Sequence, residues 1–133
     1  MTVAVQEWKR CRHWIEAALE RVSTHTIEDI EQGLAQGIYV FWPASKSVVV
    51  TEIHIYPRAK YMHVFLAGGD LEELKSMVPM LQSWARFNGC SKLTLAGRRG
   101  WERALRDQGW EANLVYLSIP AGEKDEVAAD HPI

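Results

Sequence analysis

The chain opens with apolar residues at helical spacing. From Gln6 to Val22 they recur every three or four positions, which predicts an amphipathic helix. This stripe consists of Trp8, Cys11, Ile15, Ala18, Leu19 and Val22. A shorter helix is predicted after Thr26, because Thr26 and Asp29 have the spacing of a capping box. Gly37 is predicted to end this second helix, since glycine commonly follows a helix C-terminus.

The period then changes to two residues. Segments 38–42, 47–56 and 61–67 predict three strands joined by short turns near Ser45 and Arg58. Residues 70–88 predict the longest helix, with Pro79 inside it and Gly89 at its end. The remaining elements are predicted as a strand over 92–96, a helix over 100–108 and a last strand over 112–119.

This order of elements predicts an α/β fold. The strands 61–67 and 92–96 are separated by a helix, so we expect them to run parallel through a right-handed crossover. The earlier strands are joined by tight turns and should be antiparallel. The prediction is a mixed, mainly antiparallel sheet with one parallel pair and helices on both faces. It forms one domain over residues 1–120, followed by an acidic tail over 121–133.

Charge and composition narrow the function classes. A net charge of −2 gives no general attraction to nucleic acid or to anionic membranes. No run approaches the roughly 18 apolar residues of a membrane helix. The lone residues Cys11 and Cys90 indicate neither a disulfide framework nor a zinc site. We therefore expect a cytoplasmic protein that binds no membrane, no nucleic acid and no metal.

The junction of the third strand and the long helix has conflicting features. A strand, the glycines Gly68 and Gly69, and a helix N-terminus form a natural phosphate cradle, because unpaired N–H groups point at the ligand. Yet this helix begins with Asp70, Glu72 and Glu73. These acids favour the helix dipole and repel an anion at the same place. The architecture indicates a nucleotide-type cofactor, and the charges argue against one.

Two later segments give the chain a family resemblance. Residues 83–95 (SWARFNGCSKLTL) resemble the end of the cofactor-binding helix and the next strand of the Gcn5-related N-acetyltransferase (GNAT) family. Residues 103–110 (RALRDQGW) resemble that family's closing helix and its Gly-aromatic turn. The resemblance covers about residues 8–119 in element order. It implies that the gap between strands 61–67 and 92–96 would receive the pantetheine arm of acetyl-CoA.

The chain departs from this family where the chemistry takes place. The family's pyrophosphate loop, Gln/Arg-x-x-Gly-x-Gly/Ala, falls on Gly69, Glu72 and Leu74. One carboxylate about 5 Å from a phosphate charge costs about 3 kcal/mol at an effective dielectric near 20, or about a hundredfold in affinity. The tyrosine that commonly acts as general acid falls on Leu105, which carries no proton to donate. We therefore expect no acetyl-CoA; the alternative is a shifted cradle at Gly68 and Gly69.

The predicted hairpin carries a second candidate for chemistry. If residues 57–60 form its turn, His54 faces His63, Tyr56 faces Tyr61 and Glu52 faces Phe65. The opposite face of the hairpin would hold Ile53, Ile55, Met62, Val64 and Leu66. Two histidines and a carboxylate on one face could supply a general base or part of a metal site. The alternative, which we favour, is a polar sheet face without catalytic residues.

Arg98, Arg99 and Trp101 follow the end of the strand 92–96. Two guanidinium groups beside an indole could hold a phosphate or a carboxylate. Alternatively the arginines are solvated and Trp101 belongs to the core. Since parallel strands end at one edge of a sheet, we expect this set to lie beside Asp70, Glu72 and Glu73. Charged clusters of opposite sign at one edge predict a protein interface or self-association.

Three functions follow from the sequence. The first is a non-catalytic structural or interaction protein with a GNAT-like fold. Here the acidic residues after Gly68 and Gly69, and the segment 97–101 (GRRGW), resemble small bacteriophage-encoded proteins of this fold. That resemblance implies a virion or particle-assembly role, in the host cytoplasm or the virion. The second is a divergent acetyl-CoA-dependent N-acetyltransferase with Glu52 or His63 as the base. The third is a small-ligand or regulatory binding module that uses Arg98, Arg99 and Trp101.

Overall fold

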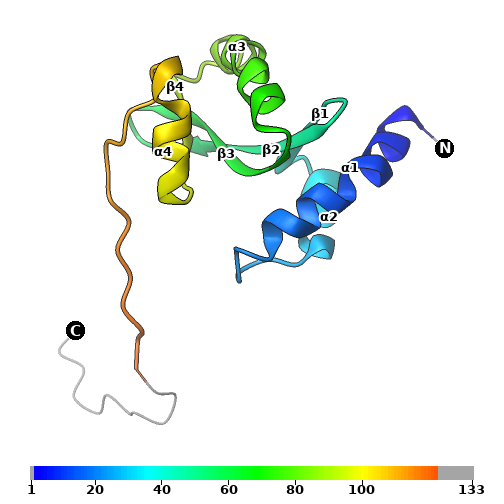
Figure 1. Cartoon of the computed structure of the whole chain (residues 1–133), viewed down its shortest axis with the longest axis horizontal. Coiled ribbons are helices and arrows are strands. Elements are labelled where there is room, and N and C mark those ends of the chain that lie inside the picture. The colour runs from blue at the N-terminus through cyan, green and yellow to red at the C-terminus, as the bar shows by residue number, and fades with distance from the viewer. Residues whose placement is uncertain (1, 123–133) are drawn as a thin grey trace.

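The protein is a four-stranded mixed sheet with helices on both faces (Figure 1). The structure, a computed structural model, describes residues 2–122; apart from its first two residues, the predicted tail 121–133 lies outside them. The elements are α1 (Val3–Leu19), α2 (Ile27–Ala35), β1 (Tyr39–Pro43), β2 (Ser47–Ile55), β3 (Lys60–Gly69), α3 (Leu71–Phe87), β4 (Lys92–Leu95), α4 (Arg99–Leu105) and the 3-10 turn η1 (Arg106–Gln108). The sheet order is β1-β2-β3-β4, antiparallel except for the parallel pair β3–β4. The predicted fold class is therefore confirmed.

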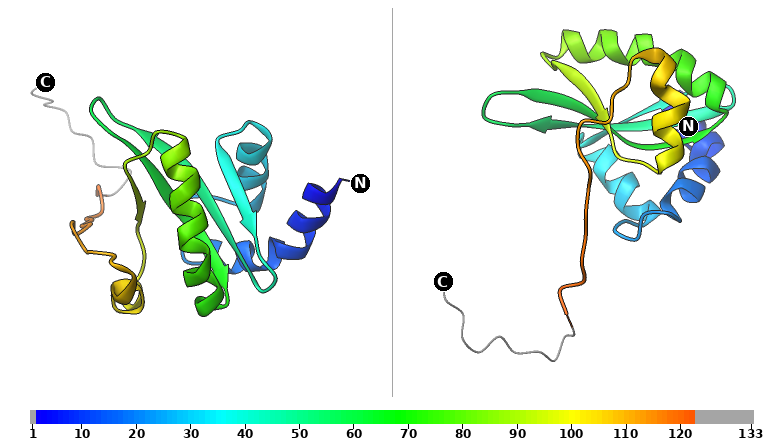
Figure 2. Two further views of the ribbon diagram at one scale, coloured as in Figure 1. Left: turned by 90° about the horizontal axis from the view of Figure 1, so that it is seen from above. Right: turned by 60° about the vertical axis from the view of Figure 1, so that its left-hand side comes forward.

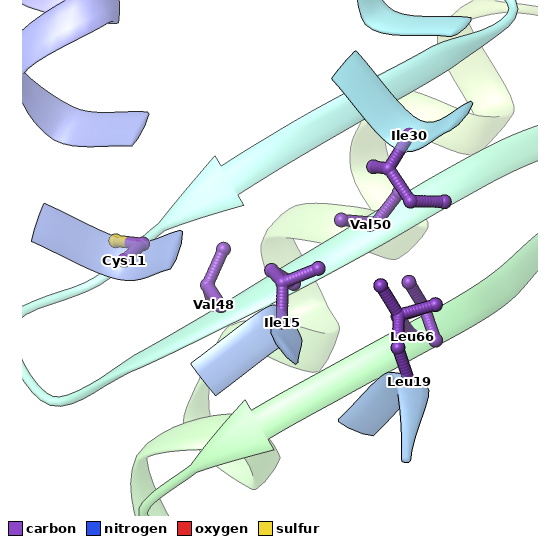
Figure 3. Close-up of a cluster of buried hydrophobic side chains, with 7 residues drawn as sticks. All are labelled: Cys11, Ile15, Leu19, Ile30, Val48, Val50 and Leu66. Carbon is purple, nitrogen blue, oxygen red and sulfur yellow. The ribbon is translucent and has the colours of Figure 1, made fainter. Parts of the chain in front are cut away.

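Helices α1 and α2 cover one face of the sheet. Their buried side chains meet those of β2 and β3 in a cluster formed by Cys11, Ile15, Leu19, Ile30, Val48, Val50 and Leu66 (Figure 3). Helix α1 begins three residues earlier than predicted, because Thr2 caps it by accepting a hydrogen bond from the Val5 N–H. The predicted capping box of Thr26 and Asp29 is confirmed at the start of α2.

Helices α3 and α4 lie on the opposite face. The second core cluster joins α3 to the centre of the sheet and consists of Val49, Met62, Leu74, Met77, Leu81, Ala85 and Cys90. Asp70 caps α3 by accepting a hydrogen bond from the Glu73 N–H, and Pro79 lies inside this helix as predicted. No helix among residues 2–122 is long and apolar enough to cross a membrane.

The pairing of β2 with β3 corrects the predicted hairpin register. Glu52 pairs with His63, and His54 pairs with Tyr61, whereas the prediction paired His54 with His63 and Glu52 with Phe65. The register shifts where Val50 pairs with Leu66 while Thr51 pairs with Val64, which leaves Phe65 as an extra residue in β3. This is a β-bulge, and bulges re-aim the side chains that follow them.

The bulge also corrects the assignment of faces. Leu66 was predicted on the same face as Met62 and Val64, but it packs against α1, while Met62 and Val64 pack toward α3. A single inserted residue inverts the alternation of a strand, and the hydrophobic pattern alone does not reveal it. Ile55, predicted to fill that same side, is 77% exposed at the end of β2.

The predicted last strand is wrong. Residues 112–119 form neither helix nor strand, and all of them are exposed. The chain over residues 110–122 runs away from the sheet as an extended segment, drawn in orange in Figure 1 and in both views of Figure 2. The local pattern does favour a strand, but a strand also needs a partner edge, and this segment lies beside none in the described chain.

Candidate functional site

The two glycines of the predicted phosphate cradle are used for close packing. A Cβ atom on Gly68 would lie 2.8 Å from the carbonyl oxygen of Trp14 on α1. Gly69 has φ +114°, and a Cβ there would lie 2.2 Å from the carbonyl oxygen of Lys46. The Asp70 N–H donates to that same carbonyl at 3.1 Å. The strand end is thus pressed against α1 on one side and the β1–β2 turn on the other.

Glu73 closes this junction further. Its carboxylate accepts hydrogen bonds from the hydroxyls of Ser45 and Ser47 and, at 2.7 Å, from the backbone N–H of Lys46. The hydroxyl bonds, with the amide bond added, lower the pKa of Glu73 below its ordinary value. A carboxylate of this chain therefore already takes donors at the mouth of the would-be cradle. The sequence analysis did not identify the serines, because no helical or strand pattern connects 45–47 with residue 73.

The gap between β3 and β4 is filled by side chains. The two strands pair from Tyr61 to Val64, after which β3 continues to Gly69 while β4 ends at Leu95. The crevice beyond that point has a volume of about 40 Å³. Its lining comes from β2, β3, α3, β4 and α4, and includes Trp101, Leu105 and Trp110. Small-molecule pockets are typically about 300–1,000 Å³. The crevice is therefore several times smaller than a typical small-molecule pocket.

The residues that the sequence predicted to form an interface here differ in their exposure. Asp70, Glu72, Arg98 and Arg99 are exposed. Trp101 is instead half-buried and packs against the α3-side core, and a Cβ added to Gly97 would lie 2.7 Å from its ring. The indole thus packs against Gly97 and the core, as in the alternative prediction that Trp101 belongs to the core. The arginine pair remains at the surface without it.

The structure brings Glu52, His54 and His63 together on the same face of the sheet as α1 and α2, beyond the part of that face that these helices cover. His54 Nε2 lies 2.8 Å from Glu52 Oε1, and the two imidazole rings stack with centroids 4.6 Å apart. His63 Nδ1 lies 2.8 Å from the hydroxyl of Thr94 on β4. Tyr56 Oη lies 3.4 Å from His54 Nδ1. Because of the shifted register, His54 on β2 and His63 on β3 are diagonal rather than direct neighbours. Their rings are nevertheless in contact.

Burial lowers the pKa of His63, the nearby His54 lowers it further, and Glu52 partly offsets both. These surroundings favour the neutral form of His63. When its Nδ1 donates to Thr94, its Nε2 carries the lone pair that accepts a proton. Thr94 was not identified from the sequence, although its place in the alternation of β4 puts it opposite His63.

The same three side chains offer ligand atoms within 4.8 Å of one another, which is compact enough for a metal ion. A bound metal requires lone pairs that converge on one point. The imidazole rings stack within 20° of parallel, so their in-plane lone pairs point side by side. The arrangement suits proton exchange better than metal coordination.

A groove that the sequence analysis did not identify lies beside the first half of β4. Its volume is about 350 Å³. Its walls are the C-terminal half of α3, the residues Ser91, Lys92 and Leu93, and the chain from Gln108 to Glu111 with Asn113. A groove at a strand edge has no sequence signature of its own, because its walls come from three separate segments.

Comparisons with known proteins support the fold. No protein-family model matches the sequence, and no curated protein matches it significantly. Among solved structures, a probable acetyltransferase superposes with a TM-score of 0.62 at 7% identity, over 84% of this chain and 89% of the other.

Two acetyltransferases of stated substrate also match. An aminoglycoside N-acetyltransferase in complex with CoA gives a TM-score of 0.61 at 12% identity, with 86% of each chain covered. Glucosamine-6-phosphate N-acetyltransferase from Arabidopsis thaliana gives 0.56 at 14% identity, over 80% of this chain and 88% of that one. The chain therefore has the fold of the GNAT acetyltransferases, and identities this low establish the fold alone.

Proposed function

We propose that this protein is a non-catalytic interaction or assembly protein built on the acetyltransferase fold. One observation carries the proposal: the places where this fold would hold acetyl-CoA are occupied by the chain itself. Glu73 binds the β1–β2 turn, Gly69 closes on Lys46, and Trp101 and Leu105 line a crevice of only about 40 Å³. An acidic helix N-terminus adds repulsion toward a pyrophosphate.

Acetyl-CoA binding tests this proposal. A ligand at 100 times its Kd adds about 2.7 kcal/mol of stability, which shifts the melting temperature of a domain of this size by several degrees. We expect millimolar acetyl-CoA to leave the melting temperature unchanged. A shift of several degrees would overturn the proposal.

A matched variant separates the two reasons for weak binding. Glu72→Gln removes an exposed carboxylate at the helix N-terminus without touching the contacts of Glu73 with the turn. If repulsion alone prevents binding, this variant gains affinity for acetyl-CoA. If the closed junction and the filled crevice prevent it, the variant behaves as the wild type, which is the result we expect.

The interface that we propose includes the exposed charges Asp70, Glu72, Arg98 and Arg99. They follow the C-terminal ends of the parallel strands β3 and β4, so opposite charges are present at the same end of the sheet, although β3 extends beyond the last residue of β4. Arg98→Glu with Arg99→Glu should abolish association through this edge without unfolding the chain, since exposed charge changes typically alter stability by under about 0.5 kcal/mol. Light scattering and circular dichroism measure the two effects separately. An unchanged assembly would exclude this edge as the interface.

The setting that we propose is a bacteriophage particle or its assembly in the host cytoplasm. It is supported by the sequence resemblance of the acidic segment after Gly69 and of residues 97–101 to small bacteriophage-encoded proteins. Purified particles probed with an antibody against the chain are expected to contain it. Its presence only in the surrounding lysate would contradict a virion role.

A divergent N-acetyltransferase is the second candidate, and the fold neighbours fit it equally well. The observation that favours it is a half-buried imidazole, His63, whose pKa is lowered and which lies beside Glu52 and His54 on one face of the sheet. In that case His63 would take the proton from an acceptor amine. Release of free CoA from acetyl-CoA in the presence of a panel of amines, abolished by His63→Ala, would establish it.

A further inference from the structure

The segment 112–119 is an unpaired strand sequence. The side chains of Leu114, Val115, Tyr116, Leu117 and Ile119 are 82–91% exposed. The segment contains no charged residue. Exposed strands in stable proteins are normally protected by charges, bulges or proline within the strand, and the eight residues here have none of these. An uncharged, exposed apolar segment of this kind is therefore prone to pair with a free strand edge.

The same molecule carries an unpaired strand edge. β4 is the last strand of the sheet and pairs only with β3, so the outward N–H and C=O groups of Lys92–Leu95 have no strand beside them in the described chain. The groove of about 350 Å³ is lined by Lys92 and Leu93, the first two residues of this strand. Eight extended residues span about 26 Å and four span about 13 Å, so the segment is long enough to cover the whole of β4.

The groove and the segment are continuous. Trp110, Glu111 and Asn113, which come just before the exposed, mostly apolar residues 114–119, line the groove. The backbone then runs away from the sheet (Figure 2). Gly109 has φ +89° and provides the sharp turn from which the segment departs. A molecule whose strand leaves beside its own vacant edge is arranged for reciprocal exchange, because one two-fold contact fills both edges.

We propose that residues 112–119 add as a fifth strand to the free edge of β4 in a second copy of this chain. Each copy of the chain carries one unpaired segment and one free β4 edge, so in a dimer every segment has an edge to pair with. The charged residues that line the groove are Arg86, Lys92 and Glu111, so its lining is positive by one charge, which suits the acidic sequence that follows the segment in the chain. This inference rests on the proposed assembly function, and it names the strand and the edge that would mediate assembly.

Two matched variants test the exchange. Val115→Asp with Leu117→Asp places charge on the strand, and we expect it to convert a dimer of the full chain into a monomer with unchanged circular dichroism. Ser23→Asp with Thr24→Asp adds the same charge to an exposed turn between α1 and α2 and should leave the dimer intact. Light scattering at several concentrations measures both. A wild type that stays monomeric, or a dimer that survives the first variant, would overturn the proposal.

Cross-linking decides whose edge the strand occupies. One preparation carries Lys92→Cys, and a second carries, in turn, Val115→Cys, Tyr116→Cys or Leu117→Cys; the native Cys11 and Cys90 are buried. Mixing the two preparations under mild oxidation should give a disulfide-linked species of twice the chain mass for at least one pair. If the segment folds back on its own β4, only chains carrying both substitutions form the bond, without a change of mass, and the proposal is wrong.

The charge variant Arg98→Glu with Arg99→Glu keeps the two proposals distinguishable. If it dissociates the assembly while the segment variant has no effect, the charged edge is the interface and the strand exchange is excluded. If only the segment variant dissociates the assembly, the exchange stands and the charged edge is not needed. If neither changes a stable dimer, both proposals fail.

Discussion

β3 and the segment 112–119 have similar sequences and opposite surroundings. Both are rich in aromatic, β-branched and other apolar residues, and both favour a strand. β3 pairs with β2 on one side and β4 on the other, and Met62 and Leu66 are buried on opposite faces of the sheet, against α3 and α1 respectively. The segment pairs with nothing in the described chain. The comparison teaches that a strand pattern reports a capacity for pairing, while a partner edge decides whether the strand forms.

The largest expected difference is between the truncation of a leucine in β3 and the truncation of a leucine in the segment 112–119. Leu66 is 3% exposed and Leu117 is 84% exposed. Leu66→Ala should lower the free energy of unfolding by about 2–5 kcal/mol, because it leaves a cavity between the sheet and α1. At concentrations where the chain is monomeric, Leu117→Ala should change it by less than about 0.5 kcal/mol. Urea unfolding measures both. A large cost for Leu117 in the monomer would mean that the segment packs on its own domain.

A smaller effect is expected at the end of β3, where two glycines differ in their surroundings. Gly69→Ala should destabilise the chain by about 1–3 kcal/mol, because its φ is +114° and the new Cβ would meet the Lys46 carbonyl. Gly100 in α4 has open space and no positive φ, so Gly100→Ala should stabilise by about 0.5 kcal/mol. Thermal unfolding gives both signs. If Gly69→Ala did not lower the stability, the contact between the end of β3 and the β1–β2 turn would be looser than the structure indicates. A ligand could then fit at this junction.

Much of the fold could be predicted from the sequence because its signals are local. The capping box at Thr26, the helix ending before Gly89 and the parallel pair of β3 and β4 follow from short-range rules that the structure obeys. The two main errors were non-local. The bulge at Phe65 depends on how β3 fits both β2 and α1, and the fate of 112–119 depends on which edge is available. Neither is encoded in the period of the pattern.

The candidate site shows the same division. Glu52, His54 and His63 could be placed on one face from alternation alone, and the structure brings them together. The contacts of Glu73 with Ser45 and Ser47 could not be predicted, because a carboxylate at a helix N-terminus has the same local role whether or not a turn lies above it. Because of these contacts, the carboxylate of Glu73 already takes hydrogen-bond donors beside the glycine turn, where the sequence alone indicated a site for a bound anion.

The smallest expected effect concerns protonation on β3, at the end of the sheet that α1 and α2 leave uncovered. The imidazole of His63 should titrate below its ordinary value of 6.5, because burial and the neighbouring His54 disfavour its charged form while Glu52 favours it. A folded pKa below the unfolded one means that the unfolded chain binds the proton first as pH falls. The contribution of His63 to stability is therefore present above about pH 6.5 and is lost as pH falls through the folded pKa.

NMR titration of the ring of His63 tests each cause separately. In His54→Gln the midpoint should rise, since a neighbouring positive charge is removed, and in Glu52→Gln it should fall, since a favourable negative charge is removed. His13→Gln, which removes an exposed histidine on α1, is the matched control. If both cluster variants left the midpoint where it is in the control, the three side chains would not be coupled. His63 would then be a half-buried histidine with a structural role only, and the acyltransferase alternative would have no general base.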